Sequence, residues 1–424
     1  SWNWLMFGFP SRSETQHVRT MPWVSRMRAL MLLLAFLVVM AGSAHAANNS
    51  VQGAKKDEGG FQTDAPHAIL IEAESGSVLF EKNADQLTQP SSMMKLMTLE
   101  VVFDALAKGE IKPTDQYFVS ENSWRRGGAP AGGPTMFAAI QSRVPVEDLL
   151  RGAIIQNGND SAMILAEGMA GNEVAFAERL TKRARELGLM QSTFANASGL
   201  SNPGNRMTMR ELAVLARHII GAYPDFYKIF NEREFTWNKI RQQNRNPLLN
   251  ALASADGLAV GFTKEGGYGL VGSAVQNGLR LIVAINGMED ADDRASEAKR
   301  ILEWGFRNFE VRNLFESGQV IGDAKVFGGQ SGSVPLVAKT PVKVMVQRNG
   351  SDKLLARIVY TGPVRAPVEA GQRIGAVKVW RGGSIAVEAP VYAERAVARG
   401  TLAGRAFDTA GELFIGLFRA AAKL

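Results

Sequence analysis

Ser92 and Lys95 are the residues of this chain whose types and spacing most directly suggest chemistry. Residues three apart on a helix are neighbours on one face, and the segment after Ser92 is apolar around nearly the whole helical circumference, as a buried helix is. Burial disfavours the ammonium form of a lysine and lowers its pKa, so the amine of Lys95 can take the proton from the Ser92 hydroxyl. The pair therefore predicts a serine nucleophile with a lysine base.

The spacing alone does not establish catalysis. Ser296 and Lys299 are also three residues apart, but the charged residues around them predict an ordinary exposed helix. The apolar run after Ser92 distinguishes Ser92 and Lys95 from Ser296 and Lys299. Such a run predicts a buried helix, and a lysine is almost never buried without a partner. A purely structural role for the first pair is the alternative to the catalytic interpretation.

The composition describes a globular protein with mixed charge. The chain has 424 residues with 46% apolar content and 43 glycines, enough for two domains. It carries 48 basic and 41 acidic residues, a net charge of +7, without a basic stripe interleaved with aromatics. This pattern favours anionic surfaces such as lipid or wall polymer over nucleic acid. Four histidines and no cysteines argue against a zinc site, a thiol nucleophile or disulfides, so we expect no metal and no organic cofactor.

The N-terminal segment has the pattern of a secretory signal. Arg26 and Arg28 precede an apolar stretch at 29–40, and Ala44-His45-Ala46 offers small residues for cleavage. We predict a signal peptide and upstream residues over 1–46, with translation starting at Met21 or Met27, and a linker over 47–63. An uncleaved membrane anchor is the alternative. Either way the mature part is expected across the inner membrane, in the periplasm.

Two helices and a glycine-rich loop follow a predicted β-hairpin in the first structured region. Apolar runs at 68–73 and 77–81 predict the hairpin. Residues 126–134, rich in Gly and Pro, predict a surface loop that borders a cleft. The helices are expected at 146–155 and 161–169. The polar segment Asn157-Gly158-Asn159-Asp160 between them either caps the helices or faces a cleft, and the pattern leaves both open.

A second hairpin and a helix are predicted further along. Residues 269–274 and 279–285 are predicted strands. Gln276-Asn277-Gly278 joins them and contains Asn-Gly, which favours a hairpin turn. A helix carrying Trp304 is expected at 294–306.

These residues together resemble the serine-type D-alanyl-D-alanine carboxypeptidases, the low-molecular-weight penicillin-binding proteins, whose motifs are Ser-x-x-Lys, Ser-x-Asn and Lys-Thr-Gly. Besides Ser92 and Lys95, the resemblance rests on Gly76-Ser77-Val78-Leu79, Asn83-Ala84-Asp85, Gly158-Asn159-Asp160, Asn196 with Gly199-Leu200, Asp256-Gly257-Leu258, Gly267-Tyr268-Gly269-Leu270 and Trp304-Gly305-Phe306.

The resemblance implies a fold and a domain order. We expect a mixed α+β/α/β catalytic domain of the penicillin-binding-protein/β-lactamase type at 64–307, and then a small all-β sandwich domain at 308–398. Short β-like runs separated by turn residues after Asn308 agree with such a sandwich.

The resemblance also implies a mechanism. Ser92 would attack the amide carbonyl between the two terminal D-alanines of a peptidoglycan stem peptide, with Lys95 as base, and water would hydrolyse the acyl-enzyme. β-Lactams would acylate the same serine. Backbone N–H groups of Ser92 and of a strand residue near Phe262 would form the oxyanion hole. Arg294 matches an arginine that helps to receive the terminal carboxylate of the substrate, and its alternative is an ordinary surface arginine.

The chain departs from the second motif of the family. Asn157 replaces the serine, and its amide can orient a water or a substrate but is neither an acid nor a base at neutral pH. Asn159 keeps the role of contacting the lysine and the substrate.

The third motif is altered more strongly, to Ala259-Val260-Gly261-Phe262-Thr263. The lysine charge and one hydroxyl expected to bind the substrate carboxylate are absent. Gly261 still permits a close approach of the strand, Thr263 keeps a hydroxyl, and we assign Ala259, Gly261 and Thr263 with Arg294 to substrate binding. Lys264 lies five residues beyond Ala259, so a regular strand directs it to the opposite face.

Three functions fit these motifs, and we predict the first. It is a working carboxypeptidase with altered carboxylate recognition. The second is a catalytically impaired peptidoglycan-binding or regulatory relative. The third is a related hydrolase such as an endopeptidase or a β-lactamase, although no glutamate is found in the expected kind of loop to serve as deacylation base.

The C-terminal segment at 409–424 is predicted to form an amphipathic helix. Leu413, Phe414, Leu417 and Phe418 fall on one side, and Lys423 falls with the charged residues on the other. We expect this helix to lie on the outer leaflet of the inner membrane, and the alternative is docking on its own domain.

Overall fold

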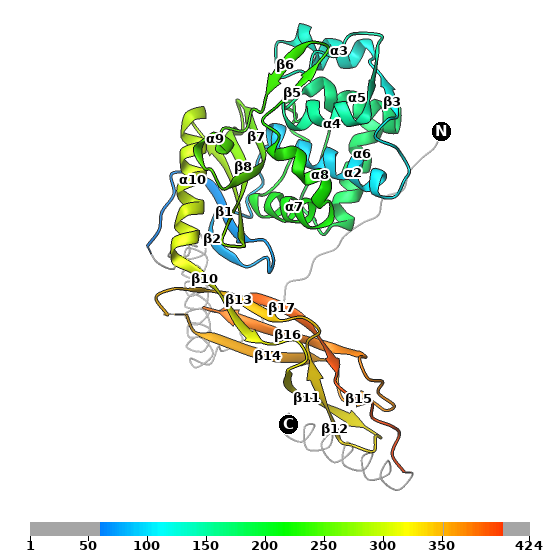
Figure 1. Cartoon of the computed structure of the whole chain (residues 1–424), viewed down its shortest axis with the longest axis vertical. Helices are drawn as coiled ribbons and strands as arrows, with labels where there is room; N and C mark the ends of the chain where they lie inside the picture. Colours follow the sequence, from blue (N-terminus) through cyan, green and yellow to red (C-terminus); the bar gives the residue numbers. More distant parts are fainter. Residues whose placement is uncertain (1–59, 351, 402–424) are drawn as a thin grey trace, which may run out of the picture. The chain divides into compact units, whose positions relative to one another are not determined.

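The computed structural model describes residues 60–350 and 352–401 (Figure 1). The predicted signal peptide (1–46), residues 47–59 of the predicted linker and the predicted helix at 409–424 lie outside the described residues. Within the described ranges, no helix combines the length and the apolar character needed to cross a membrane.

An antiparallel sheet forms the centre of the catalytic domain. Its order is β2-β1-β9-β8-β7, with every neighbouring pair antiparallel. Successive side chains of a strand point to opposite faces, and β1 shows this alternation. Ile69 and Ile71 join one hydrophobic cluster, whereas Ala68 and Leu70 join another. The strands are β1 (His67–Glu72), β2 (Val78–Lys82), β7 (Ala255–Thr263), β8 (Gly267–Gln276) and β9 (Leu279–Met288).

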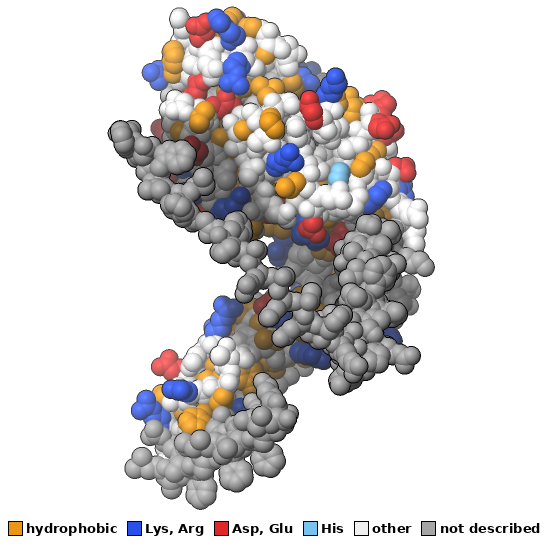
Figure 2. Space-filling model, turned by 180° about the vertical axis from the view of Figure 1, so that it is seen from behind, with side chains coloured by type: hydrophobic (Ala, Val, Ile, Leu, Met, Phe, Trp, Pro, Cys, Tyr) orange, Lys and Arg blue, Asp and Glu red, His pale blue; other side chains and the backbone are white. Residues whose placement is uncertain are grey.

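Helices cover both faces of this sheet, as Figure 1 shows. On one face α10 (Ala291–Asn308) packs on β8 and β9. On the other face α7 (Met209–Ala222) packs on β1 and β9 and connects the sheet to the helical region. Charged side chains of both signs are interspersed over the face of the molecule drawn in Figure 2. Two cores therefore flank one sheet, and the larger one contains the helix that follows Ser92.

The helical region contains both helices predicted from the sequence. The expected helix at 146–155 is α4 (Val146–Ile154), and the one at 161–169 is α5 (Asn159–Ala170). The remaining elements of the catalytic domain are η1 (Ser91–Met94), α2 (Lys95–Ala107), β3 (Gln116–Phe118), α3 (Glu121–Gly127), η2 (Ala129–Ala131), β4 (Arg143–Pro145), α6 (Glu173–Glu186), α8 (Pro224–Tyr227), η3 (Lys228–Asn231), β5 (Glu234–Trp237), β6 (Ile240–Gln243) and α9 (Leu248–Ala251).

Both predicted hairpins are confirmed. β1 pairs with β2, and β8 pairs with β9 across Asn277 and Gly278, whose φ angles are 50° and 77°. Positive φ at both central positions is what a type I′ hairpin turn requires. The segment around Ser92 differs from the prediction of a uniform helix, because its first turn is the 3₁₀ helix η1 and the α-helix begins at Lys95.

The C-terminal domain is all-β. β10 pairs with β13, and six further strands form a sheet in the order β14-β16-β17-β12-β11-β15. Valines of both sheets share one core that includes Val344 and Val379. The strands are β10 (Phe309–Phe315), β11 (Val320–Phe327), β12 (Ser333–Val337), β13 (Val342–Gln347), β14 (Leu354–Tyr360), β15 (Val364–Arg365), β16 (Arg373–Arg381) and β17 (Ser384–Ala393).

Glu100 anchors α2 inside the helical region. Its carboxylate is fully buried. It accepts hydrogen bonds from Arg183 at 2.9 Å and from Tyr223 at 3.0 Å, and His218 Nε2 lies 3.0 Å away. Burial raises the pKa of Glu100, but the hydrogen bonds from His218 and Arg183 outweigh it and leave the pKa lowered. The helix that carries Lys95 is thus tied to α6 and α7 through one buried carboxylate.

Replacing Glu100 by alanine is expected to lower the free energy of unfolding by about 3–5 kcal/mol, because breaking a buried pair leaves a charge without its partner. Urea unfolding followed by circular dichroism measures the change. Glu110→Gln is the matched control, since Glu110 pairs with Arg179 at the surface, where such a pair contributes about 1 kcal/mol or less. Equal stability of the two variants would contradict the anchoring role.

Candidate active site

A strained turn presents Ser92. Ser91 before it has a φ of 50° and donates a hydrogen bond from Oγ to the Pro90 carbonyl at 2.6 Å. Gly199 packs against this turn so closely that a Cβ atom there would lie 2.1 Å from the Ser91 carbonyl oxygen. A non-glycine residue adopts a left-handed backbone conformation only where the surrounding structure holds it there. Here the loop that contains Gly199 holds Ser91.

Lys95 is buried beside Ser92, as the sequence predicts. Its side chain is only 2% exposed, and Nζ donates to Ser92 Oγ at 2.9 Å and to Asn159 Oδ1 at 2.8 Å. Burial lowers the pKa of Lys95 to about 7, against the opposing effect of the Asp160 carboxylate. A substantial fraction of the amine is therefore neutral near pH 7 and within reach of the serine proton.

Asn159 faces the cleft rather than capping a helix with its side chain. It is the first residue of α5, is 5% exposed and reaches Lys95 across the space between two helices. Its backbone N–H donates to the Pro134 carbonyl at 2.8 Å, and Gly133 lies against its side chain. The predicted glycine- and proline-rich loop therefore does border the cleft.

Asp160 supports the site, a role that its place in the Gly158-Asn159-Asp160 segment did not predict. It is fully buried and accepts hydrogen bonds from Thr135 Oγ1 at 2.7 Å and from the backbone N–H groups of Met136, Ala138 and Ser161. Burial raises its pKa. The carboxylate fixes the loop beside Asn159, and its place next to the second motif was the only signal in the sequence.

Asn157 connects the helical region to the sheet. Its φ angle is 59°, and its Nδ2 donates to the Val260 carbonyl of β7 at 3.4 Å. The structure records no hydrogen bond between its side chain and Ser92 or Lys95. The amide thus holds the two walls of the cleft together at the position where the second motif departs from the family.

Strand β7 is the edge strand that lies against η1. A Cβ atom on Gly261 would lie 2.1 Å from Ser91 Oγ and 2.9 Å from the Ser92 backbone nitrogen. Glycine is therefore needed where the strand passes the nucleophile. Phe262, 51% exposed, stacks on Tyr268 with ring centroids 4.1 Å apart.

Thr263 and Arg294, two predicted substrate-binding residues, both have partners within the protein. Thr263 is buried, and its Oγ1 accepts a hydrogen bond from the Gly266 backbone N–H at 2.9 Å. Arg294 of α10 donates from Nη1 to the Gly261 carbonyl at 3.1 Å and lies over the Tyr268 ring. Burial lowers the pKa of Arg294. Arg294 thus supports β7 from behind the strand, while Thr263 closes the turn that follows it.

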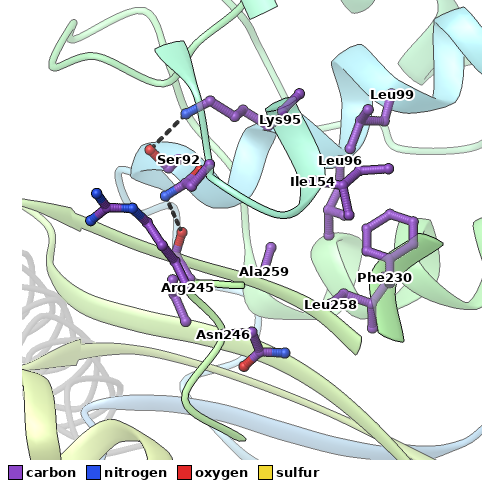
Figure 3. A pocket seen from close by; sticks show the side chains of 13 residues that line it. Ser92, Lys95, Leu96, Leu99, Ile154, Phe230, Arg245, Asn246, Leu258 and Ala259 are labelled. Atoms are coloured by element: carbon purple, nitrogen blue, oxygen red, sulfur yellow. Dashed lines mark hydrogen bonds between the residues drawn. The ribbon is translucent and has the colours of Figure 1, made fainter. Parts of the chain in front are cut away.

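A small hollow of about 20 Å³ lies beside the nucleophile, with room for about one water molecule (Figure 3). It brings together Ser92, Lys95, Asn157 and Ala259 from the predicted set, and apolar residues of α2 and α4 line its inner wall. Arg245, whose type and position gave no signal in the sequence, also lines it. Among the described residues, no cluster of histidine and acidic side chains could hold a metal ion.

Comparisons with known proteins agree with this arrangement. Residues 51–290 match the family model described as D-alanyl-D-alanine carboxypeptidase, and residues 309–399 match that of the penicillin-binding protein 5 C-terminal domain. The chain is 36% identical to D-alanyl-D-alanine carboxypeptidase DacC of Escherichia coli K12, over 91% of this chain and 95% of that protein.

Solved structures resemble the chain as well. The penicillin-binding protein 5 of Haemophilus influenzae is 34% identical, with a TM-score of 0.71, 80% of this chain covered and 99% of that one. Penicillin-binding protein 6B of Escherichia coli is 29% identical, with a TM-score of 0.63, 81% of this chain covered and 98% of that one. With a serine and a buried lysine in hydrogen-bond contact at the centre of this fold, the chain belongs to the serine-type D-alanyl-D-alanine carboxypeptidase family.

Proposed function

We propose that Ser92 is the nucleophile with which this serine-type carboxypeptidase removes the terminal D-alanine from peptidoglycan stem peptides, and that Lys95 is its base. The observation that carries the proposal is the 2.9 Å contact between Lys95 Nζ and Ser92 Oγ, together with a pKa of about 7 for the lysine. A serine hydroxyl is a weak nucleophile until a neighbouring base takes its proton, and a neutral amine at this distance can take it.

Acylation uses the amine twice. Neutral Lys95 takes the proton from Ser92 Oγ as the oxygen forms a bond to the carbonyl carbon between the two D-alanines. The negative charge that develops on the carbonyl oxygen is received by the backbone N–H groups of Ser92 and of Phe262 on β7. The C–N bond then breaks, and the leaving D-alanine amine takes the proton back from Lys95. Since Asn157 cannot relay a proton, this route depends on the lysine alone.

Deacylation repeats the proton transfer with water. Lys95 takes a proton from the attacking water, the ester bond to Ser92 breaks, and the proton returns to Ser92 Oγ. Asn159 Oδ1, which accepts a hydrogen bond from Lys95 Nζ at 2.8 Å, keeps the amine in place through both steps. We assign Asn157 to holding the cleft wall, and Ala259 and Gly261 of β7 to the substrate side of the site. Thr263 and Arg294, whose side chains have partners within the protein, support that strand.

Penicillin is expected to acylate residues 47–424 at Ser92 and to produce one covalent adduct by intact-mass spectrometry. Ser92→Ala is expected to abolish the adduct, and Ser296→Ala, in the other Ser-x-x-Lys sequence, is the matched control that keeps it. D-Alanine release from a pentapeptide then measures turnover. An adduct that survives in Ser92→Ala would refute the assigned nucleophile, and no adduct in any variant at millimolar penicillin would indicate a relative that only binds peptidoglycan.

The rate of acylation is expected to rise with pH. Only the neutral amine accepts a proton, so below a pKa of about 7 the second-order rate constant should increase about tenfold per pH unit and level off above it. The measurement is penicillin acylation between about pH 5.5 and 8.5. Asn159→Asp places a negative charge beside Lys95 and should move the midpoint to higher pH. A flat profile for the unmodified protein would argue against Lys95 as base.

The protein is further proposed to act in the periplasm, attached peripherally to the outer leaflet of the inner membrane. The support is the signal-like pattern of 1–46 and the apolar side of the segment at 409–424, which contains Phe414 and Phe418.

Deleting residues 409–424 is expected to move the protein from the membrane fraction to the soluble periplasmic fraction. N-terminal sequencing of the mature protein establishes whether the signal is cleaved, and Phe414→Asp combined with Phe418→Asp keeps the length of the segment while removing its apolar side. Retention of both variants in the membrane, with a cleaved signal, would refute attachment through this segment.

A further inference from the structure

Asn286, near the end of β9, is a buried polar residue that takes no part in the proposed mechanism. Its side chain is fully buried, and the side chains before it alternate between the two faces of the sheet. Ile282 and Ala284 belong to the hydrophobic cluster that includes the side chains of η1, whereas Ile285 belongs to the cluster on the other face. Because successive side chains of a strand point to opposite faces, Asn286 follows Ile282 and Ala284 on the face toward η1. The apolar row on this face therefore ends in an amide.

A β-bulge lies at this position. The register of β8 against β9 shifts between Tyr268 and Leu270, so that Asn286 and the residue after it together oppose Gly269. A bulge bends the strand locally and changes the direction in which its side chains point. A Cβ atom on Gly269 would lie 2.6 Å from Asn286 Oδ1 and 2.4 Å from Met93 Cε. The absence of a side chain at this glycine therefore leaves room for the amide beside η1.

The Asn286 amide holds the segment that leads into the turn of the nucleophile. Its Nδ2 donates to the Gln89 carbonyl at 2.9 Å and to Thr88 Oγ1 at 3.1 Å. The Thr88 hydroxyl donates in turn to the Met207 carbonyl at 3.2 Å, and the backbones of Thr88 and Met207 exchange two further hydrogen bonds. Residues 88 and 89 are therefore held from the sheet and from the segment before α7 at the same time.

The hydrogen bonds of this amide are one-sided. Both are donated by Nδ2, and the buried Oδ1 has no hydrogen-bond partner among the residues described. A buried acceptor without a donor lowers the stability of a protein, and such a group in a native structure calls for an explanation. An apolar side chain would avoid the unpaired oxygen, but it could not donate to Thr88 and Gln89. The contact with these two residues is therefore what the asparagine contributes.

We propose that Asn286 is a positioning residue that fixes the backbone of Ser92 through the Gln89 carbonyl. The inference rests on the proposed function. Only Pro90 and Ser91 separate Gln89 from the nucleophile. The φ angle of a proline is fixed by its ring, and Ser91 is held at a φ of 50°, so a shift of the Gln89 peptide is transmitted to Ser92. Both Oγ and the backbone N–H of the proposed oxyanion hole would then move, and a misplacement of about 1 Å can slow a reaction about 100-fold.

The test measures acylation by penicillin at increasing concentrations, which separates the limiting rate constant from the dissociation constant of the non-covalent complex. Asn286→Leu nearly preserves the size of the side chain and removes the donor. It is expected to lower the limiting rate constant about 10- to 100-fold, with little change in the dissociation constant. The midpoint of the pH profile should stay where it is in the unmodified protein, because the hydrogen bonds of Lys95 are untouched.

Two further variants distinguish positioning from a loss of stability, which urea unfolding measures for each variant. Ser273→Ala is the matched control, because it removes a buried hydroxyl of β8 that donates to the Leu281 carbonyl of the same sheet, and it should keep the acylation rate. Thr88→Val removes one of the two acceptors of the Asn286 amide and should slow acylation less than Asn286→Leu. In the double variant the two losses should not multiply, because both act through one contact.

The outcomes separate the inference from the proposed function. An unchanged limiting rate constant in Asn286→Leu, or a loss that Ser273→Ala shares, would overturn the inference and leave the proposed function standing. A shifted pH midpoint would also overturn it, because the effect would then lie on Lys95. If Asn286→Leu does not fold, Thr88→Val decides by the same criteria. If penicillin forms no adduct with the unmodified protein, the proposed function fails, and the inference fails with it.

Discussion

The burial of one lysine amine is the constraint on which the site depends. Lys95 lies in a helix that is apolar on nearly all sides, so its charged form is disfavoured and its pKa falls to about 7. A buried amine without hydrogen-bond partners would cost several kcal/mol, and Ser92 and Asn159 provide those partners. The same contacts that make the buried lysine tolerable also place it where the proposed mechanism needs a base. Stability and catalysis are therefore served by one arrangement.

That arrangement requires three elements to meet within contact distance. The turn η1 carries Ser92, α5 carries Asn159, and β7 passes close enough to η1 that position 261 has no room for a side chain. The Asn157 amide, bonded to the Val260 carbonyl, joins the helical wall to the strand. The Asn157 amide maintains this contact between the helical wall and the strand but cannot transfer a proton. The altered second motif therefore preserves the geometry of the cleft, and the proposed mechanism leaves all proton transfer to Lys95.

Local patterns in the sequence predicted the chemical centre and most of the surrounding elements. Spacing and the apolar run after Ser92 identified Ser92 and Lys95, a short apolar run identified β1, and Asn277-Gly278 identified the hairpin turn. The role of Asp160 was not predictable in the same way, because it depends on contacts with the loop at 135–138, more than twenty residues away in the chain. The 3₁₀ geometry of η1 was also missed, because the close approach of Gly199 and Gly261 to this turn cannot be seen in the local sequence.

Catalysis and recognition place opposite demands on positive charge at this site. In the proposed mechanism the base must be neutral, and burial lowers the pKa of Lys95 to about 7. A group that binds a carboxylate must keep its charge, and a guanidinium keeps it in nearly any environment. A lysine at position 259 would instead place a second ammonium in the same hollow as Lys95 and favour the neutral base further. Its absence therefore leaves the pKa of Lys95 to be set mainly by burial.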